Sequence, residues 1–546
     1  MPTAQPNAVV CAIEARRGDT VWLPVTARKH GFLTLGRVTA PKPSRDSEGC
    51  GRHRGAARRR HHRRRSTVSS DPFTLGVASG DPAPDGAVIW TRLAPHPLAD
   101  DGLGGMPGRP VDVEWEVASD ERFSSVAQRG ITTAMPEAAH SVHVELVGLQ
   151  PGADYFYRFR SGGFVSPTGR TRTSPAQGSL TPLTMCVASC SNYEQGWFTA
   201  YRRLAQEYPD LIVHLGDYQY EYAATGEGVR EHVGPETVTL ANYRQRYAQY
   251  KTDADLQAAH AVAPWLAVFD DHEVANNWAD EVPENPDPGF PSRRAAALQA
   301  YYENMPLRSS AMPHGIDMQL YRRVQWGDLA TMHMLDTRQY RTDQPCGDEI
   351  RTDCVERILP FATLTGPEQE RWLLNGFQQS RSRWDILGQQ VFFSQVDLTP
   401  GPGRGLNPDA WDGYTANRDR IIEGIVHSPV RNAVVLTGDI HSHWAAEVHS
   451  RFDDPVSPVV ATELVTTSIS SGGDGSDMRD DIAVLLPENP HIRYYSGRRG
   501  YVRAHFTAED MRADFRVLPY VSRPGAAVQT EVSFVVPDRA PALHAM

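Results

Sequence analysis

Side chains of the kinds that bind metals follow four separate apolar segments of this chain. Each segment has the length of a buried β-strand, and a thiol, phenol, carboxylate or imidazole comes within a few residues of its end. Because the carboxyl ends of parallel strands meet at one edge of a sheet, we expect these groups to converge on one site. In chain order they are Cys190, Asp217, Tyr220, Asp270, Asp271, His272, Asp439, His441 and His443.

The mixture of donor types predicts two cations of different character. A free tyrosine gives up its proton near pH 10, so Tyr220 requires a hard, highly charged ion such as Fe3+ to bind as phenolate at neutral pH. The thiolate of Cys190 also suits iron. The carboxylates of Asp271 and Asp439 favour Ca2+, Mg2+ or Mn2+ at a neighbouring position, and Asp217 has two oxygens with which to bridge the cations.

Each of these residues alone has an ordinary structural explanation. An aspartate after a strand often caps a helix or forms a turn. A tyrosine is commonly a packed aromatic, and a buried cysteine commonly behaves as a small hydrophobe, which is our interpretation of Cys186. Four strand ends that all carry ligand types favour a metal site over four coincidences.

The elements that must position these groups form an α/β pattern. From residue 176 to 546, near-continuous apolar strands alternate with helical stretches, which indicates sheets covered on both faces and a C-terminal extension beyond them. Residues 73–175 carry short alternating strands separated by turn clusters, typical of a small β-sandwich. Within them, LQPGADYFYRF resembles a strand of fibronectin type III-like domains. Residues 1–72 are expected to form a disordered basic leader.

Charge is distributed unevenly along the chain. Residues 1–65 contain 15 of the 55 Lys and Arg and 4 of the 66 Asp and Glu, a net charge of +11 that leaves −22 for the remainder. Three explanations of the arginine-rich start stay open: a basic arm for nucleic acid or anionic lipid, a twin-arginine export signal, and a non-native leader. The apolar stretch that an export signal needs does not follow the arginines. The acidic body does not favour nucleic acid as a partner.

Three further features lead to structural expectations. No run approaches the ~18 apolar residues that cross a bilayer, so we expect no membrane span, and we expect a monomer. Cys346 and Cys354 flank a short polar segment and are expected to form a local disulfide, with two free thiols as the alternative. We interpret Val465–Asp477 as a flexible solvent loop, with a place at the border of the site as the alternative.

The motifs that carry the candidate ligands resemble those of binuclear metallophosphoesterases. The family motif GDxxY is matched by GDYQY, and variants of GNHE and GHxH are found as DDHE and GDIH. Five segments in order resemble the PhoD-type alkaline phosphatases, and the resemblance extends over about residues 72–530. These segments are SCSNYEQGWFTAYRRLA, HLGDYQYEY, FDDHEVANNWA, LDTRQYRTDQPC and LTGDIHSHW.

The resemblance implies a fold and a set of metal ligands. The fold is a metallophosphoesterase-type β-sandwich flanked by helices and preceded by a small all-β domain. Cys190, Asp217 and Tyr220 would hold Fe3+, and Asp217 would also face a Ca2+ site that includes Asp271. Mn2+, Mg2+ and Zn2+ are alternatives at the second site. Asp439 and His441 match a metal-binding motif, and their assignment to one cation or the other stays open.

Further residues receive roles toward the substrate. His272 matches a position that acts on substrate oxygens, and Asn276 or Asn277 would hydrogen-bond the phosphate. Gln389 or Gln390 stands where the superfamily has a histidine ligand and would bind through its carbonyl oxygen. Arg338 is a candidate phosphate clamp, with partnership to a carboxylate as the alternative.

The implied activity is hydrolysis of phosphate mono- or diesters by a metal-bound hydroxide, in an exported protein. Two other hypotheses stay open. One is a phospholipase D-type phosphodiesterase on the same scaffold, acting on choline phospholipids. The other is a non-catalytic binding protein with a degenerate site, which the intact ligand types in every motif disfavour.

Overall fold

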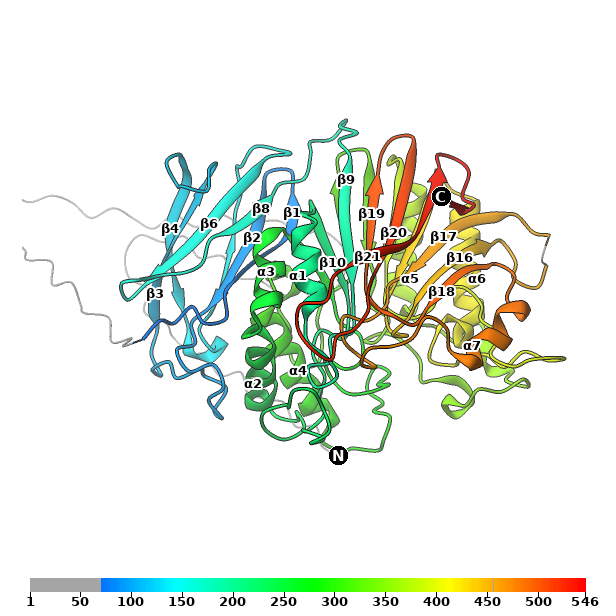
Figure 1. Ribbon diagram of the computed structural model, residues 1–546, viewed down its shortest axis with the longest axis horizontal. Helices are drawn as coiled ribbons and strands as arrows, with labels where there is room; N and C mark the ends of the chain where they lie inside the picture. Colours follow the sequence, from blue (N-terminus) through cyan, green and yellow to red (C-terminus); the bar gives the residue numbers. More distant parts are fainter. Residues whose placement is uncertain (1–69, 455) are drawn as a thin grey trace, which may run out of the picture. The chain divides into compact units, whose positions relative to one another are not determined.

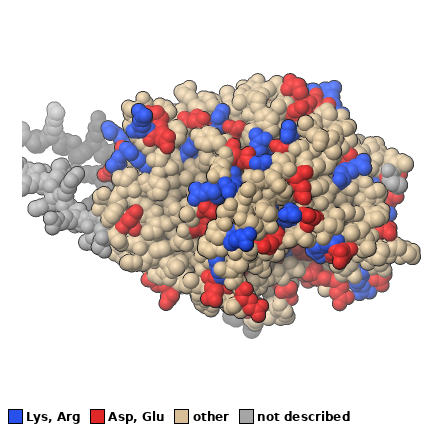
Figure 2. Space-filling view, in the orientation of Figure 1, with Lys and Arg blue, Asp and Glu red and all other residues tan. Residues whose placement is uncertain are grey.

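The computed structural model describes residues 70–454 and 456–546 (Figure 1). The expected basic leader, residues 1–72, lies outside the described residues except for its last three. No helix in the described part of the chain is long and apolar enough to cross a membrane. On the face shown in Figure 2, acidic and basic side chains are interspersed, so that face carries no broad patch of a single sign.

Two large β-sheets form the centre of the structure. In sheet order, the first contains β22 (His544–Ala545), β21 (Gln529–Pro537), β20 (Asp510–Leu518), β19 (Arg499–Phe506), β9 (Leu183–Ala188), β10 (Leu211–Leu215), β11 (Trp265–Val268), β1 (Val77–Ala83), β2 (Gly86–Arg92) and β5 (Ser141–Glu145). The second contains β12 (Arg322–Trp326), β13 (Ala330–Met334), β14 (Trp384–Gly388), β15 (Ala433–Thr437), β17 (Val459–Val465), β16 (His443–His449) and β18 (Ile492–Ser496).

Both sheets have parallel strands at their centre. β9, β10 and β11 are parallel neighbours in the first sheet, and β13, β14 and β15 are parallel neighbours in the second. Successive residues of a strand point to opposite faces, and here both faces are buried. In β15, Val434 packs between the sheets, whereas Val435 packs against helices on the outer side. Burial on both faces explains the near-continuous apolar runs in the sequence.

Helices cover the two outer faces of the paired sheets (Figure 1). On the first sheet they are α1 (Thr199–Gln206), α2 (Leu240–Lys251), α3 (Ala254–Val262) and α4 (Phe290–Asn304). On the second sheet they are α5 (Gly366–Gln378) and α6 (Thr415–Val426). The short helix α7 (Asp480–Leu485) and single turns of 3-10 helix lie in connections, the turns being η1 (Pro136–Ala138), η2 (Ser309–Ala311), η3 (Pro345–Asp348), η4 (Glu356–Ile358), η5 (Trp411–Tyr414) and η6 (Leu486–Glu488).

The first part of the described chain is all-β, as expected, but its strands divide between two sheets. A separate sheet contains β4 (Val126–Ala134), β3 (Val111–Ala118), β6 (Asp154–Ser161) and β7 (Phe164–Val165), with β8 (Gly169–Arg172) paired to β6. It packs across an apolar core against β1, β2 and β5. Those three strands belong to the ten-stranded sheet, because β1 pairs in parallel with β11 at Gly80 and Trp265. The β-sandwich therefore shares one layer with the α/β region.

Candidate metal centre

The candidate ligands follow the carboxyl ends of four parallel strands, where the chain turns sharply. Gly216 separates β10 from Asp217 and has φ +103°; a Cβ at this position would lie 2.4 Å from the Cβ of Asp270. Glycine therefore allows the ends of β10 and β11 to approach each other. Gly438 likewise precedes Asp439, and a Cβ there would lie 2.9 Å from the Cβ of Ser189.

Four of the expected ligands have left-handed backbone conformations. The φ angles are 58° at Cys190, 54° at Asp217, 65° at Asp439 and 55° at His441. This conformation costs roughly 1–2 kcal/mol for a residue with a Cβ. Such strain concentrates at functional sites, where the surrounding fold holds a side chain in a required direction. Four strained residues, two after strands of the first sheet and two after β15 of the second, support a functional role for the place where these strand ends meet.

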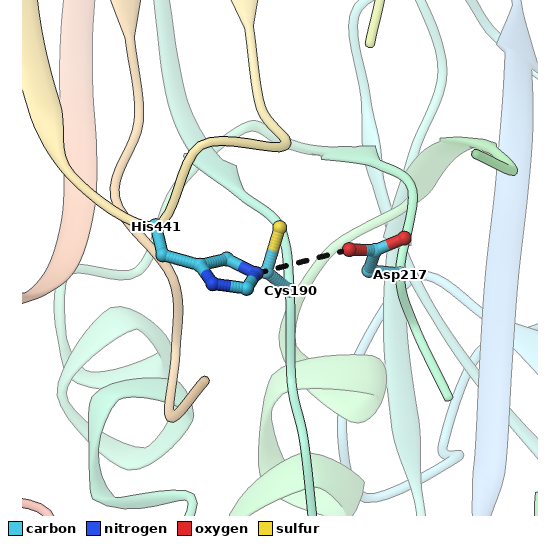
Figure 3. A group of neighbouring side chains, drawn as sticks. All are labelled: Cys190, Asp217 and His441. Atoms are coloured by element: carbon cyan, nitrogen blue, oxygen red, sulfur yellow. Dashed lines mark ion pairs between the residues drawn. The ribbon is translucent and has the colours of Figure 1, made fainter. Parts of the chain in front are cut away.

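The ligand atoms gather in three overlapping groups, and within each group they lie within 4.8 Å of one another. Figure 3 shows the first group, in which Cys190, Asp217 and His441 come from three different loops and point toward one another. Because Asp217 and Asp271 each belong to two groups, the three groups form one continuous centre. The groups are Cys190, Asp217 and His441; Asp217, Asp271 and His272; and Asp270, Asp271 and Asp439.

Tyr220 joins the first group through hydrogen bonds. Its hydroxyl donates to Oδ2 of Asp217 at 2.9 Å and lies 3.0 Å from Nε2 of His441. The hydroxyl of Ser471 lies 2.7 Å from the same phenol oxygen. Thiol, phenol, carboxylate and imidazole therefore meet at one point.

Three carboxylate oxygens of the centre are buried and have no hydrogen-bond partner among the described residues. They are Oδ1 of Asp217, Oδ2 of Asp270 and Oδ1 of Asp271. A buried polar atom without a partner is costly, and native structures contain few of them. Oxygens of this kind are the ligands that hard divalent cations prefer. The donor set therefore fits a hard divalent cation at these carboxylates.

Burial and mutual repulsion keep several of these acids from ionising in the absence of a cation. Burial raises the pKa of Asp217 to about 7. Burial, with repulsion from neighbouring aspartates, raises the pKa of Asp270 and of Asp439 well above the usual range. Burial also raises the pKa of the Cys190 thiol and of the Tyr220 phenol. A bound cation lowers these pKa values, because its positive charge favours the ionised form of each ligand.

His272 lies among the carboxylates with one ring nitrogen held by a partner. Its Nδ1 is 2.8 Å from Oε2 of Glu221, and its ring centroid is 4.1 Å from that of Tyr220. Burial lowers the pKa of His272, but Glu221, Asp271 and Asp217 outweigh burial and leave it well above the usual value. The sequence analysis missed Glu221, although it stands in the same GDYQYEY segment.

The two asparagines lie beside the centre and contact carboxylates. The backbone N–H of Asn277 donates to Oδ2 of Asp271 at 2.9 Å, and its side-chain amide donates to Asp348 at 2.8 Å. The side-chain amide of Asn276 donates to Glu284 at 2.9 Å. Asp348 lies between Cys346 and Cys354, whose sulfur atoms are bonded at 2.07 Å. The expected contact of either asparagine with phosphate stays a prediction.

Arg338 and the two glutamines are engaged by other side chains. Arg338 is completely buried and donates to Asp270 at 2.6 Å and to Asp409 at 2.9 and 3.0 Å. It is a carboxylate partner, the alternative to a phosphate clamp, and its donors are directed to Asp270 and Asp409. The side-chain oxygen of Gln389 accepts from Trp411, and that of Gln390 accepts from Thr337. Each oxygen thus accepts one hydrogen bond in this structure, and a role of either glutamine as a metal ligand stays a prediction.

The segment that we interpreted as a solvent loop, Val465–Asp477, is instead largely buried at its start and forms a wall of the centre. Ser471, within it, contacts both Tyr220 and the carbonyl of Cys190. Arg499 donates to the carbonyl oxygens of His441 and Ser471. His443 lies apart from the three ligand groups, and its Nδ1 accepts from the backbone of Thr467.

Glu273 ties two of the strand ends together. Its carboxylate accepts backbone N–H groups from Asp217 at 3.0 Å, Tyr218 at 2.7 Å and Asp270 at 2.9 Å. A single buried carboxylate thus fixes the turn after β10 against the turn after β11. Its position in DDHE was visible in the sequence, but its partners on another strand were not.

Comparison with known proteins gives matches along most of the chain. The family model described as PhoD-like phosphatase matches residues 185–515, and the one described as PhoD-like phosphatase, N-terminal domain, matches residues 57–175. Alkaline phosphatase D of Bacillus subtilis (strain 168) is 49% identical over 476 residues, which cover 86% of this chain and 81% of that protein.

Solved structures agree with these matches. One described as a structure of PhoD aligns with a TM-score of 0.85 at 48% identity and covers 88% of this chain and 92% of that one. A purple acid phosphatase from yellow lupin (Lupinus luteus) seeds aligns with a TM-score of 0.54 at 13% identity, covering 86% and 74%, which is a likeness of fold alone. The resemblance inferred from the motifs is confirmed, and this chain belongs to the PhoD-like phosphatase family.

Proposed function

We propose that this protein hydrolyses phosphate mono- and diesters at a centre of two cations. The observation that carries the proposal is the set of three buried carboxylate oxygens without a hydrogen bond next to a thiol, a phenol and an imidazole. Cys190, Asp217, Tyr220 and His441 would hold Fe3+. Asp217, Asp270, Asp271 and Asp439 would hold Ca2+, with Mn2+, Mg2+ and Zn2+ as alternative occupants.

When bound, the cations supply charge neutralisation of the phosphate and activation of the attacking water. The chain's own residues orient the reaction. His272 keeps Nδ1 against Glu221, which leaves Nε2 to hold a proton for the departing ester oxygen. Glu273 fixes the loops of Asp217 and Asp270, so the carboxylates stay in place during turnover. The family and the Cys346–Cys354 disulfide also support export to an oxidising compartment.

Elemental analysis together with hydrolysis of p-nitrophenyl phosphate and bis-p-nitrophenyl phosphate tests the proposal. We expect iron and a divalent cation in the purified protein, visible absorption from thiolate or phenolate on Fe3+, and loss of hydrolysis on chelation that metal restores. Asp217→Asn should lose both metals and activity. Asp85→Asn, in the exposed turn between β1 and β2, is the matched control. A protein that binds no metal and hydrolyses neither ester would refute the proposal.

A further inference from the structure

A cavity of about 400 Å3 with mainly apolar walls opens between the loop after β14, the strand β16 and the helix α7. We call it the apolar cavity. Phe392 and Trp444 meet edge to face in its wall, with ring centroids 5.5 Å apart. Ile482 and Leu485 of α7 close one side. None of the residues in these walls has a role in the proposed chemistry.

The apolar cavity adjoins the metal centre along three separate segments of the chain. Ile440, in its wall, stands between the candidate ligands Asp439 and His441. Two further wall residues are close in sequence to residues that contact the centre. Asn407 is two positions from Asp409, and Ile350 is two positions from Asp348. Consecutive Cα atoms are about 3.8 Å apart, so the Cα atom of each wall residue lies within about 8 Å of the Cα atom of a candidate ligand or of a residue that contacts the centre. The residues in contact are Asp409, which binds Arg338, and Asp348, which binds Asn277.

The chemistry of the walls selects an apolar ligand. Asp412 is engaged by Arg418 at 2.6 Å, and the hydroxyl of Ser442 accepts from the indole of Trp444 at 2.8 Å. These buried polar groups therefore have partners of their own. The charged wall residues Arg479 and Asp481 are exposed and pair with each other. Ile350 is 53% exposed and lines the cavity. Apolar surface of this kind gains free energy when a hydrocarbon covers it.

We propose that the apolar cavity holds the hydrocarbon chain of a phosphodiester whose phosphate group lies at the metal centre. The inference rests on the proposed function and names the class of ester that the site prefers. Ile440 of the cavity wall stands between the candidate ligands Asp439 and His441, and on this adjacency we infer that the phosphate and the chain of one molecule reach the two sites together. Ile350 and Ile482, two residues of the cavity wall, are then specificity-determining residues.

A series of p-nitrophenyl n-alkyl phosphates from methyl to octyl, assayed below their micellar concentrations, tests the inference. Burial of one methylene contributes about 0.8 kcal/mol, so kcat/KM should rise about two- to fourfold per methylene until the cavity is filled. In Ile350→Asn and Ile482→Asn, the octyl-to-methyl ratio of kcat/KM should fall at least about tenfold, because a polar amide then faces the chain.

Matched controls are available on the same two segments. Val484→Asn lies on α7 and Val355→Asn lies just beyond the disulfide; both valines are outside the cavity wall and exposed, 58% and 68% respectively. Both controls should keep the wild-type ratio. Because Ile350 is itself largely exposed, its substitution tests the inference even if Ile482→Asn fails to fold.

The outcomes separate this inference from the proposed function. If the methyl ester is hydrolysed but kcat/KM does not depend on chain length, the apolar cavity holds no chain and the proposed function stands. If chain length matters equally in the wild type and in both cavity variants, the chain lies elsewhere and the inference is wrong. If the metal-loaded protein hydrolyses no ester of the series and neither p-nitrophenyl ester above, the proposed function itself fails.

Discussion

Replacement of Arg338 by methionine tests how the acidic centre is held together. The guanidinium is completely buried and is the shared partner of Asp270 and Asp409, with the nearest contact at 2.6 Å. Methionine fills a similar volume but donates no hydrogen bond, so both carboxylates lose this partner. Breaking a buried ion pair by removing one partner costs about 3–5 kcal/mol, because a buried charge is left uncompensated.

The expected loss appears as a shift of the melting temperature. For a chain of this size the unfolding entropy is about 1 kcal/mol/K, from ~2 cal/mol/K per residue, so Arg338→Met should melt about 3–5 °C below the wild type. The measurement is made by circular dichroism at pH 7 with a chelator present, so that metal binding does not mask the effect. Arg351→Met is the matched control, because Arg351 pairs with Asp353 at the surface.

The control should shift the melting temperature by about 1 °C or less, since exposed ion pairs contribute about 0–1 kcal/mol. Asp409 keeps Arg341 as a partner at 3.0 Å, so Asp270 is the carboxylate left without a cation, and adding Asp270→Asn to Arg338→Met should recover part of the loss. If Arg338→Met melts within 1 °C of the control, Arg338 does not neutralise the centre and our account of it is wrong.

Three further predictions concern single side chains. Ser471→Ala removes the hydroxyl beside the Tyr220 oxygen, so the absorption band of phenolate on Fe3+ should move to longer wavelength. Ser470→Ala is the control, and a Ser471→Ala protein with the wild-type spectrum would contradict the assignment of the band to Tyr220. Glu273→Gln should lower metal retention and kcat/KM about 10–100-fold, as loss of support for metal ligands does; unchanged metal content on elemental analysis would contradict this. Burial lowers the pKa of His214 to about 3. Between about pH 6.5 and pH 3 the unfolded chain therefore binds a proton at His214 that the folded protein does not, and the free energy of unfolding falls as the pH drops through this range. His214→Gln should reduce that slope by up to ~1.4 kcal/mol per pH unit in urea titrations, and parallel slopes would refute the assignment.

The sequence predicts the strands and most ligand types because both are local signals. An apolar run followed by Asp217 and Tyr220 is visible within a dozen residues, and it positions both at a strand end. The parallel order of β9, β10 and β11 then brings separate loops together without any further information. The α/β region with two paired sheets was predictable for the same reason.

The sequence does not predict hydrogen-bond partners that are distant in the chain. The role of Arg338 depends on Asp409, 71 residues away, and that of Gln390 depends on Thr337, 53 residues away. Ser471 reaches Tyr220 across 251 residues. Residue type alone leaves a free arginine and a neutralised arginine equally plausible, so these assignments required the fold.

The parallel pairing of β1 with β11 has a consequence for how the protein is made. During synthesis, Gly80 leaves the ribosome before Trp265 exists, and at about 5–20 residues per second the interval is roughly 10–40 s. Throughout that time β1 lacks its neighbour, and its open edge is able to pair with other nascent chains. We therefore expect truncation after residue 175 to yield an insoluble fragment and not an independent module, and chaperone dependence to be greatest for the earliest strands.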